Sequence, residues 1–152
     1  MKPLCAILAF LILLPASGLA QTREETVDFI IGEYKAFESD PYRYREITFS
    51  PSGDAFTLYR VAHGKKAYEV TFKLKDVEIY KVTINHANGI NKHQLMAHLR
   101  GWAPRMTKNG APLKGTLKIT PAIENENKCL ALERAFARLT TLTTGRKVLF
   151  SN

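Results

Sequence analysis

Apolar residues at helical spacing mark two segments, one near each end of the chain. In the first segment they form one stripe, made of Val27, Ile30, Ile31, Tyr34 and Phe37. Thr22 and Glu25 have the spacing of a capping box, in which each side chain reaches a free backbone N–H. Residues 39–41, Ser-Asp-Pro, are typical of a helix end. We therefore expect a helix that begins after Thr22 and ends before this proline.

The second helical segment covers about Asn125 to Leu142. Its apolar stripe consists of Cys129, Leu132, Phe136, Leu139 and Leu142. Gly145 follows as the expected stop, because glycine readily takes the left-handed conformation that ends many helices. Two amphipathic helices are thus available to cover the apolar face of a sheet.

Between these helices, alternating apolar and polar residues predict about six or seven strands. The clearest alternation lies in residues 68–74, where Tyr68, Val70, Phe72 and Leu74 point to one face. Residues typical of turns separate the strands at 51–54, 63–66, 88–89 and 109–110. Connections this short require antiparallel pairing.

Two places in this region depart from a simple strand pattern. Val77 and Ile79 belong to one phase of the alternation and Tyr80 begins the other, so we expect a β-bulge or a strand break near Ile79 and Tyr80. The segment His93–Trp102 fits both a strand and a helix, because its apolar residues satisfy both spacings. We assign this segment to a strand and keep a helix as the alternative.

These elements predict an α+β fold. It has an N-terminal helix, a curved antiparallel sheet or partly open barrel of about six or seven strands, and a C-terminal amphipathic helix packed on it. In the order of its elements, and in segments 68–77 and 126–142, the chain resembles a pleckstrin-homology-like (PH-like) domain. It is also similar to small, uncharacterised secreted bacterial proteins built in this way. The resemblance implies binding of peptides, proteins or phosphorylated lipids, and assigns no residue of this chain to a site.

Residues 1–20 have the features of a secretory signal peptide. Lys2 supplies the positive start, residues 4–14 are almost entirely apolar, and small residues precede the expected cleavage site near Ala20. The apolar run is shorter than the roughly 20 residues of a membrane span, and an uncleaved anchor is the alternative. We expect a secreted or periplasmic protein, folded as a single α+β domain over residues 21–152, with no transmembrane segment in the mature chain.

The net charge of +8 is concentrated in the middle of the chain. Residues 41–120 carry +9, residues 21–40 carry −4, and no Asp or Glu occurs between Val82 and Pro121. Basic residues with interleaved aromatic residues can contact an anionic partner. The candidate binding residues are Lys65, Lys66, Lys73, Lys75, Arg100, Trp102, Arg105 and Lys108. The alternative interpretation is a solvated sheet face that keeps the domain soluble.

The sequence contains no pattern that points to catalysis. The histidines lack the spacing of zinc ligands, and we expect turn or surface positions for His63, His86, His93 and His98. Cys129 lies on the apolar stripe of the last helix, where a free cysteine acts as a small hydrophobic residue rather than as a nucleophile. No metal and no cofactor is indicated.

The sequence therefore favours a non-catalytic, exported binding or interaction module. Its partner would be a protein, a peptide or an anionic surface component, and not a specific nucleic acid. One alternative is a small exported hydrolase that uses a histidine and a carboxylate, which requires these groups to share a site. The other is a carrier of an apolar ligand inside the barrel. The carrier requires an interior that is not filled by Phe56, Phe72, Leu117 and Phe136.

Overall fold

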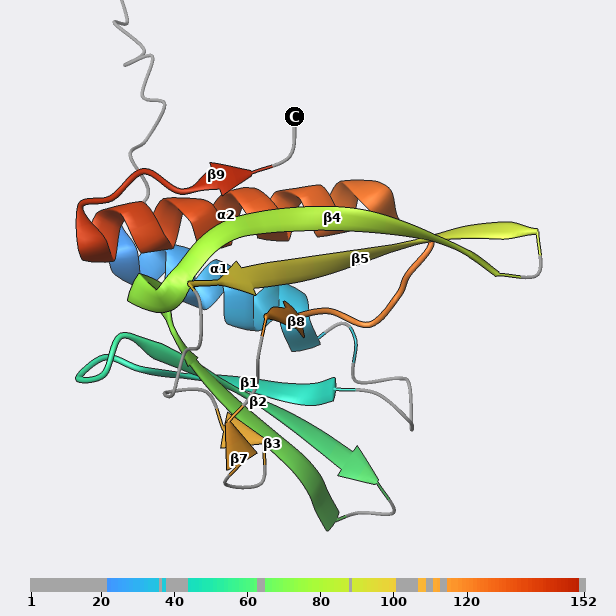
Figure 1. Cartoon of the computed structure of the whole chain (residues 1–152), viewed down its shortest axis with the longest axis horizontal. Coiled ribbons are helices and arrows are strands. Elements are labelled where there is room, and N and C mark those ends of the chain that lie inside the picture. Colours follow the sequence, from blue (N-terminus) through green and yellow to red (C-terminus); the bar gives the residue numbers. More distant parts are fainter. Residues whose placement is uncertain are drawn as a thin grey trace, which may run out of the picture.

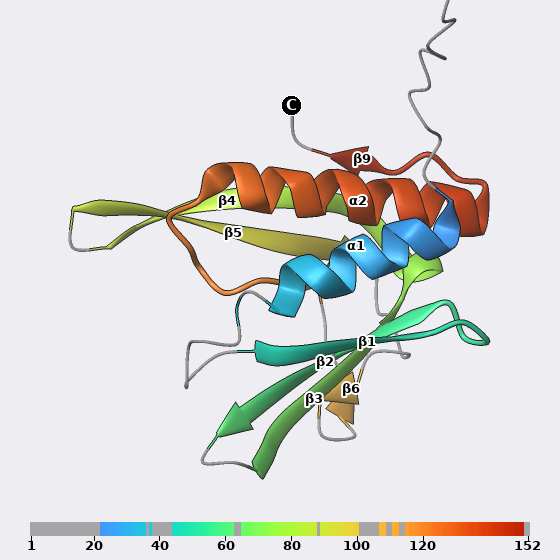
Figure 2. The ribbon, with the colours of Figure 1, turned by 180° about the vertical axis from the view of Figure 1, so that it is seen from behind.

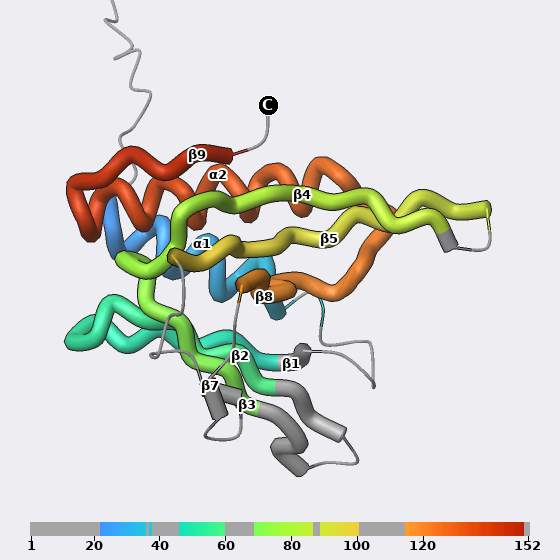
Figure 3. Tube along the Cα trace, viewed as in Figure 1, coloured from blue at the N-terminus to red at the C-terminus, as the bar shows by residue number. Residues whose placement is uncertain are grey.

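The computed structural model describes residues 22–35, 37, 44–62, 65–87, 89–100, 107–108, 111–112 and 115–150. Within these ranges, only the backbone is described at 44–45, 60–62, 65–68, 87, 107–108 and 111–112. Figure 3 traces the path of the chain. The expected signal peptide, residues 1–20, lies outside the described residues.

The described chain places one helix before the strands and one near its end (Figure 1). In order, the elements are α1 (Arg23–Lys35), β1 (Tyr44–Ser50), β2 (Ala55–Ala62), β3 (Lys65–Lys73), the 3-10 turn η1 (Leu74–Asp76), β4 (Val77–Ala87), β5 (Ile90–Leu99), β6 (Thr107–Lys108), β7 (Ala111–Pro112), β8 (Thr116–Lys118), α2 (Glu126–Thr144) and β9 (Leu149–Phe150). The first sheet has the strand order β1-β2-β3-β6-β7, and the second has the order β8-β5-β4-β9. Neighbouring strands are antiparallel, except that β4 and β9 are parallel.

The α+β class is confirmed, but the strands form two sheets in place of the expected single curved sheet or partly open barrel. The sheets separate at η1, a single turn between β3 and β4 that buries Leu74. This turn redirects the chain, so that β4 pairs with β5 instead of continuing the first sheet. Neither sheet closes on itself.

Both helices lie on the same side of the second sheet (Figure 2). The longer helix α2 runs along β4 and β5, and α1 packs beside α2 while also contacting β1 of the first sheet. No described helix or strand covers the opposite side of β4 and β5, which faces the viewer in Figure 1. The second sheet thus has one packed face and one uncovered face.

The start of α1 follows the capping box. Thr22 N donates to Glu25 Oε2 at 2.7 Å, and Glu25 N donates to Thr22 Oγ1 at 3.2 Å. The buried members of the apolar stripe are Val27, Ile30, Tyr34 and Phe37. The expected end at residues 39–41 lies outside the described residues.

Both ends of α2 agree with the sequence prediction, whereas one member of its stripe does not. The side chain of Asn125 accepts a backbone N–H at 3.1 Å, and Gly145 ends the helix with a φ of 68°. Leu142, predicted to be in the core, is 48% exposed. Because the buried stripe advances by alternate steps of about three and four residues, the position that follows Leu139 is Thr143 and not Leu142.

The segment predicted as a strand with a helical alternative is a strand as far as Leu99, the last residue of β5. Trp102, at the end of that segment, lies outside the described residues. Within β5 the alternation buries Leu95, Ala97 and Leu99 against the helices. Packing of one face against the helices thus selects a strand for a segment whose apolar spacing fits both a strand and a helix.

The slip of phase in β4 is a bulge. Val77 pairs with Leu99 and Ile79 pairs with His98, which leaves Glu78 as the extra residue. Val77 is buried before the bulge and Tyr80 is buried after it, as the change of phase predicted.

Phe136 of α2 lies at the centre of the core. Its ring centroid is 5.1 Å from that of Phe56 and 6.3 Å from that of Phe72, both in the first sheet. On the other side it is 5.5 Å from the ring of Tyr80 in the second sheet. This one side chain therefore connects both sheets to the helix. It also occupies, with its neighbours, space that an internal ligand would need.

Candidate functional site

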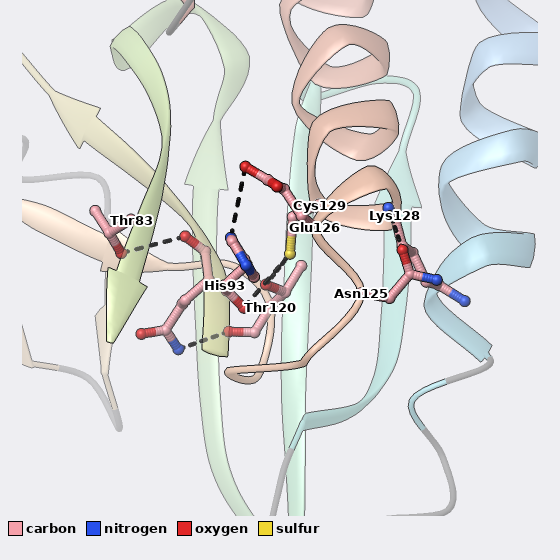
Figure 4. A network of polar contacts seen from close by, with 8 residues as sticks. Thr83, His93, Thr120, Asn125, Glu126, Lys128 and Cys129 are labelled. Carbon is pink, nitrogen blue, oxygen red and sulfur yellow. Dashed lines mark hydrogen bonds and ion pairs between the residues drawn. The ribbon is translucent and has the colours of Figure 1, made fainter. Parts of the chain in front are cut away.

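A polar network joins β5 to the first turns of α2 (Figure 4). Thr120 Oγ1 accepts the Leu95 N–H at 2.9 Å, and the Thr120 carbonyl accepts from Gln94 Nε2 at 2.8 Å. Cys129 Sγ lies 3.9 Å from Thr120 Oγ1 and donates to the His93 carbonyl at 3.5 Å. These contacts attach the segment that precedes α2 to the edge of β5.

Cys129 is a core residue, as the sequence predicted. Its side chain is fully buried, and burial raises the pKa of the thiol above its ordinary value. The S–H group donates to a backbone carbonyl and not to an imidazole. Since the thiolate is the nucleophilic form, this environment favours the inert state of the cysteine.

The imidazole of His93 is also buried, within β5 and not at the turn or surface position that the sequence predicted, and it faces the start of α2. Its Nδ1 lies 3.8 Å from Glu126 Oε1, which exceeds hydrogen-bond distance. The two groups form an ion pair only when the ring is protonated. The nearby thiol contacts the backbone of His93, so the three residues do not form a nucleophile–base–carboxylate relay.

The other described histidines lie apart from His93. His98 faces the opposite side of the sheet, where its Nδ1 is 3.3 Å from Thr116 Oγ1. His86 is exposed near the tip of the β4–β5 hairpin, and His63 lies outside the described residues. The described residues contain no cluster of three or more potential metal ligands. The hydrolase alternative therefore gains no shared site from these three histidines.

The predicted basic residues are described only in part. Trp102 and Arg105 lie outside the described residues. Lys65 and Lys66 belong to β3 and Lys108 to β6, but their side chains are not described.

The other three predicted basic residues lie around η1. Lys73 immediately precedes this turn, Lys75 lies within it, and the Arg100 N–H donates to its Asp76 carbonyl at 2.8 Å. Arg100 Nε is also 3.7 Å from Glu78 Oε1. Neighbouring carboxylates therefore partly offset the positive charge of this group.

A different set of basic side chains lies on the uncovered face of the second sheet. We call this surface the outer face. Its residues are Glu78, Ile79, Lys81, Thr83, Asn85, Ile90, Lys92, Gln94, Met96, His98, Thr116, Lys118 and Leu149. They share the phase opposite to the buried Tyr80, Leu95 and Ala97.

Strand register sets the arrangement of charge on the outer face. Lys81 pairs with Met96, and Met96 pairs with Lys118, so two lysines flank one methionine across three strands. Adjacent strands are about 4.8 Å apart, which puts the Cα atoms of these lysines about 10 Å from each other. Lys92 lies further along β5, opposite Asn85. Glu78, at the bulge in β4, is the one described carboxylate on the outer face, and its Oε1 lies 3.7 Å from Arg100 Nε.

A hollow lies on the other side of α2, away from the sheet. We call it the α2 groove. Its volume is about 660 Å³. The lining comes from α1, from the far side of α2 and from the segment that leads into β9: Phe29, Ala131, Arg134, Ala135, Ala137, Arg138, Thr141, Leu142, Gly145, Lys147, Val148 and Phe150.

Sequence reasoning selected basic residues that lie close together along the chain, and it missed Lys81 and Lys92. The sequence does contain a signal for both lysines: each occupies one of the polar positions in a strand whose alternate positions are apolar. Their proximity to Lys118 depends on the pairing of β5 with β8, which no local pattern predicts. The α2 groove left no signal, because its lining comes from three separate segments, α1, α2 and the residues leading into β9, that only the fold brings together.

Neither described helix combines the length and the apolarity that a bilayer crossing requires. Comparisons of the chain with protein-family models, with curated proteins and with solved structures find no match.

Proposed function

We propose that this chain is a non-catalytic, exported interaction module that binds an anionic membrane surface through its outer face. The observation that carries the proposal is the grouping of Lys81, Lys92 and Lys118 on one uncovered sheet face, whose one described carboxylate, Glu78, lies at the bulge beside Arg100. Each lysine near an anionic lipid surface contributes about 1 kcal/mol of attraction. Three such residues favour association by about 3 kcal/mol before any apolar contact forms.

Apolar side chains on the same face favour a membrane over a soluble polyanion. Leu149 is 64% exposed and pairs with Ile79, which is 37% exposed. Met96 lies between two lysines, and Ile90 is exposed near the hairpin tip. Basic and apolar groups that share one surface match the boundary between lipid headgroups and acyl chains.

The PH-like relationship belongs to this proposal. The packing of α2 on the second sheet, with Phe136 reaching the first sheet, supports it, because a C-terminal amphipathic helix that covers antiparallel strands is the central feature of the resemblance. The helix α1 and the parallel strand β9 are additions to the simple pattern. Export rests on the leader-like residues 1–20 and stays a prediction.

Sedimentation with lipid vesicles tests the proposal. We expect the protein to bind vesicles that contain phosphatidylglycerol, and to bind pure phosphatidylcholine vesicles much more weakly. Binding should fall as salt rises from 0.05 to 0.5 M, because the Debye length shortens from more than 10 Å to less than 8 Å. The double variant Lys81→Gln/Lys118→Gln should lose about 2 kcal/mol, or about thirtyfold in partitioning.

The matched control is Lys35→Gln/Arg134→Gln, which removes the same charge from exposed positions on the two helices. It should retain most of the binding. An equal loss in both variants would show a dependence on net charge alone and would refute the outer face as the site. Binding that persists on phosphatidylcholine, or that requires an acidic protein instead of lipid, would also refute it.

A further inference from the structure

The α2 groove is elongated and open. Its lining residues on α2 extend from Ala131 to Gly145, which corresponds to about 21 Å at 1.5 Å per residue. Its volume of about 660 Å³ falls within the range of about 300–1,000 Å³ that is usual for small-ligand sites. A long ligand therefore matches the extent of this lining better than a compact one.

Small side chains create the hollow. Ala131 and Ala135 lie one helical turn apart on the side of α2 that faces away from the sheet, where large residues would fill the space between the helix and its neighbours. The walls are apolar: Phe29 contributes from α1, and Leu142 and Phe150 remain nearly half exposed. Exposed apolar walls around an unfilled channel offer surface that a hydrocarbon chain would bury.

The charged lining residues are all cationic. They are Arg134, Arg138 and Lys147, and no Asp or Glu is among the described lining residues. Neither Arg134 nor Lys147 forms an ion pair with a described residue. The groove thus combines an apolar body with cations at its rim, which complements a molecule with an apolar tail and an anionic head.

We propose that the α2 groove binds a single-chain amphiphile that carries a carboxylate, such as a long-chain fatty acid. The chain lies along α2 against Phe29, Leu142 and Phe150, and the carboxylate is held by Arg134 or Lys147. This site is separate from the outer face, because α2 and the second sheet stand between them. The inference therefore does not depend on the proposed membrane contact.

Calorimetric titration of the protein with dodecanoate, below its micelle concentration, tests the inference. We expect saturable binding with one ligand per chain, and binding of dodecanol that is about tenfold weaker or more, because the alcohol lacks the charged hydrogen-bond acceptor. The double variant Arg134→Gln/Lys147→Gln should lose this preference for dodecanoate while still binding dodecanol. Ala131→Trp, which fills the groove, should abolish binding of both ligands.

Asn127→Trp is the matched control, since it adds the same bulk at an exposed position of α2 outside the groove lining. It should bind dodecanoate like the parent protein. If Ala131→Trp does not fold, as judged by circular dichroism, Thr141→Trp introduces the same ring at an exposed lining position. All these variants should keep the vesicle binding of the parent, so that failure here and failure of the membrane proposal are separate results.

Three results would overturn the inference. The first is the absence of dodecanoate binding by the parent protein. The second is a folded groove-filling variant that binds as well as Asn127→Trp. The third is a dimer in sedimentation equilibrium that Ala131→Trp dissociates and dodecanoate does not, which would make the groove an interface between two copies of the chain.

Discussion

Phe136 offers the most direct test of the fold. Its side chain is fully buried and contacts rings from the helix side of both sheets, namely Phe56, Phe72 and Tyr80. Replacing it by alanine removes a large buried apolar group and leaves a cavity that rigid strands on two sides cannot easily close. We expect Phe136→Ala to lower the free energy of unfolding by about 3–5 kcal/mol.

That loss is a large fraction of the total stability of a typical domain, which is about 5–15 kcal/mol. The variant Phe136→Leu keeps most of the volume and loses mainly the aromatic contacts, so it should cost about 1–1.5 kcal/mol. Phe150→Ala is the matched control, because this phenylalanine is 43% exposed and lies outside the core. Its cost should be about 1 kcal/mol or less.

Urea denaturation followed by far-ultraviolet circular dichroism measures all three variants. The urea midpoint should fall most for Phe136→Ala, less for Phe136→Leu and least for Phe150→Ala, while the slope of the transition stays unchanged. A cost for Phe136→Ala below about 1.5 kcal/mol, or equal to that of Phe150→Ala, would contradict the placement of the Phe136 ring between the two sheets. The packing on which the outer face and the α2 groove both depend would then be wrong.

Two further predictions concern the helices and the alkaline range. Gly32→Ala, in α1 with open space around the glycine, should raise the unfolding free energy by about 0.5–1 kcal/mol. Gly145→Ala should lower the unfolding free energy by about 1–2 kcal/mol, because Gly145 has a φ of 68°, a conformation that alanine rarely adopts. Thermal unfolding measures both variants, and an increase in stability at both sites would contradict the helix boundaries. Burial raises the pKa of both the Cys129 thiol and the Tyr80 hydroxyl, so the folded state holds protons that the unfolded chain releases above about pH 8.5 and 10, respectively. Stability should therefore decline above about pH 8.5 in urea titrations, and Tyr80→Phe should flatten the steeper decline near pH 10; an unchanged slope would refute the burial of the hydroxyl.

Local signals were sufficient for the start of α1 and the end of α2. The hydroxyl–carboxylate spacing of Thr22 and Glu25 and the flexibility of Gly145 each act within a few residues, and both appear as predicted. The bulge in β4 was predictable for the same reason, since a change of phase is visible in neighbouring residues. Features whose cause is local can be inferred from sequence alone.

The division into two sheets has no comparable local cause. It depends on η1, a turn of three residues whose sequence, Leu-Lys-Asp, differs little from the strand ends around it. It also depends on contacts between distant segments, such as the pairing of β5 with β8 and of β4 with β9. Strands of two or three residues have no measurable period, so neither β8 nor β9 could set its own partner.

The candidate surfaces also depend partly on local sequence and partly on contacts between distant segments. The alternation along β4 and β5 was enough to place lysines on a solvated face, but only the register across three strands brings Lys81 and Lys118 to either side of Met96. The eight predicted binding residues were chosen by nearness in sequence, and the three with described side chains gather at η1 beside Asp76 and Glu78 instead. Charge in a segment predicts that a basic surface exists, whereas strand pairing decides which residues form it.

The short strand β9 is where the two proposed surfaces come closest. Because β9 runs parallel to β4, Leu149 pairs with Ile79 and Phe150 pairs with Tyr80. Consecutive residues of a strand point to opposite faces, so Leu149 joins the outer face while Phe150 lines the α2 groove. A substitution at either residue therefore perturbs one surface directly and leaves the side chains of the other in place. Because the two side chains point to opposite faces of β9, the experiments on the two surfaces test the same fold independently.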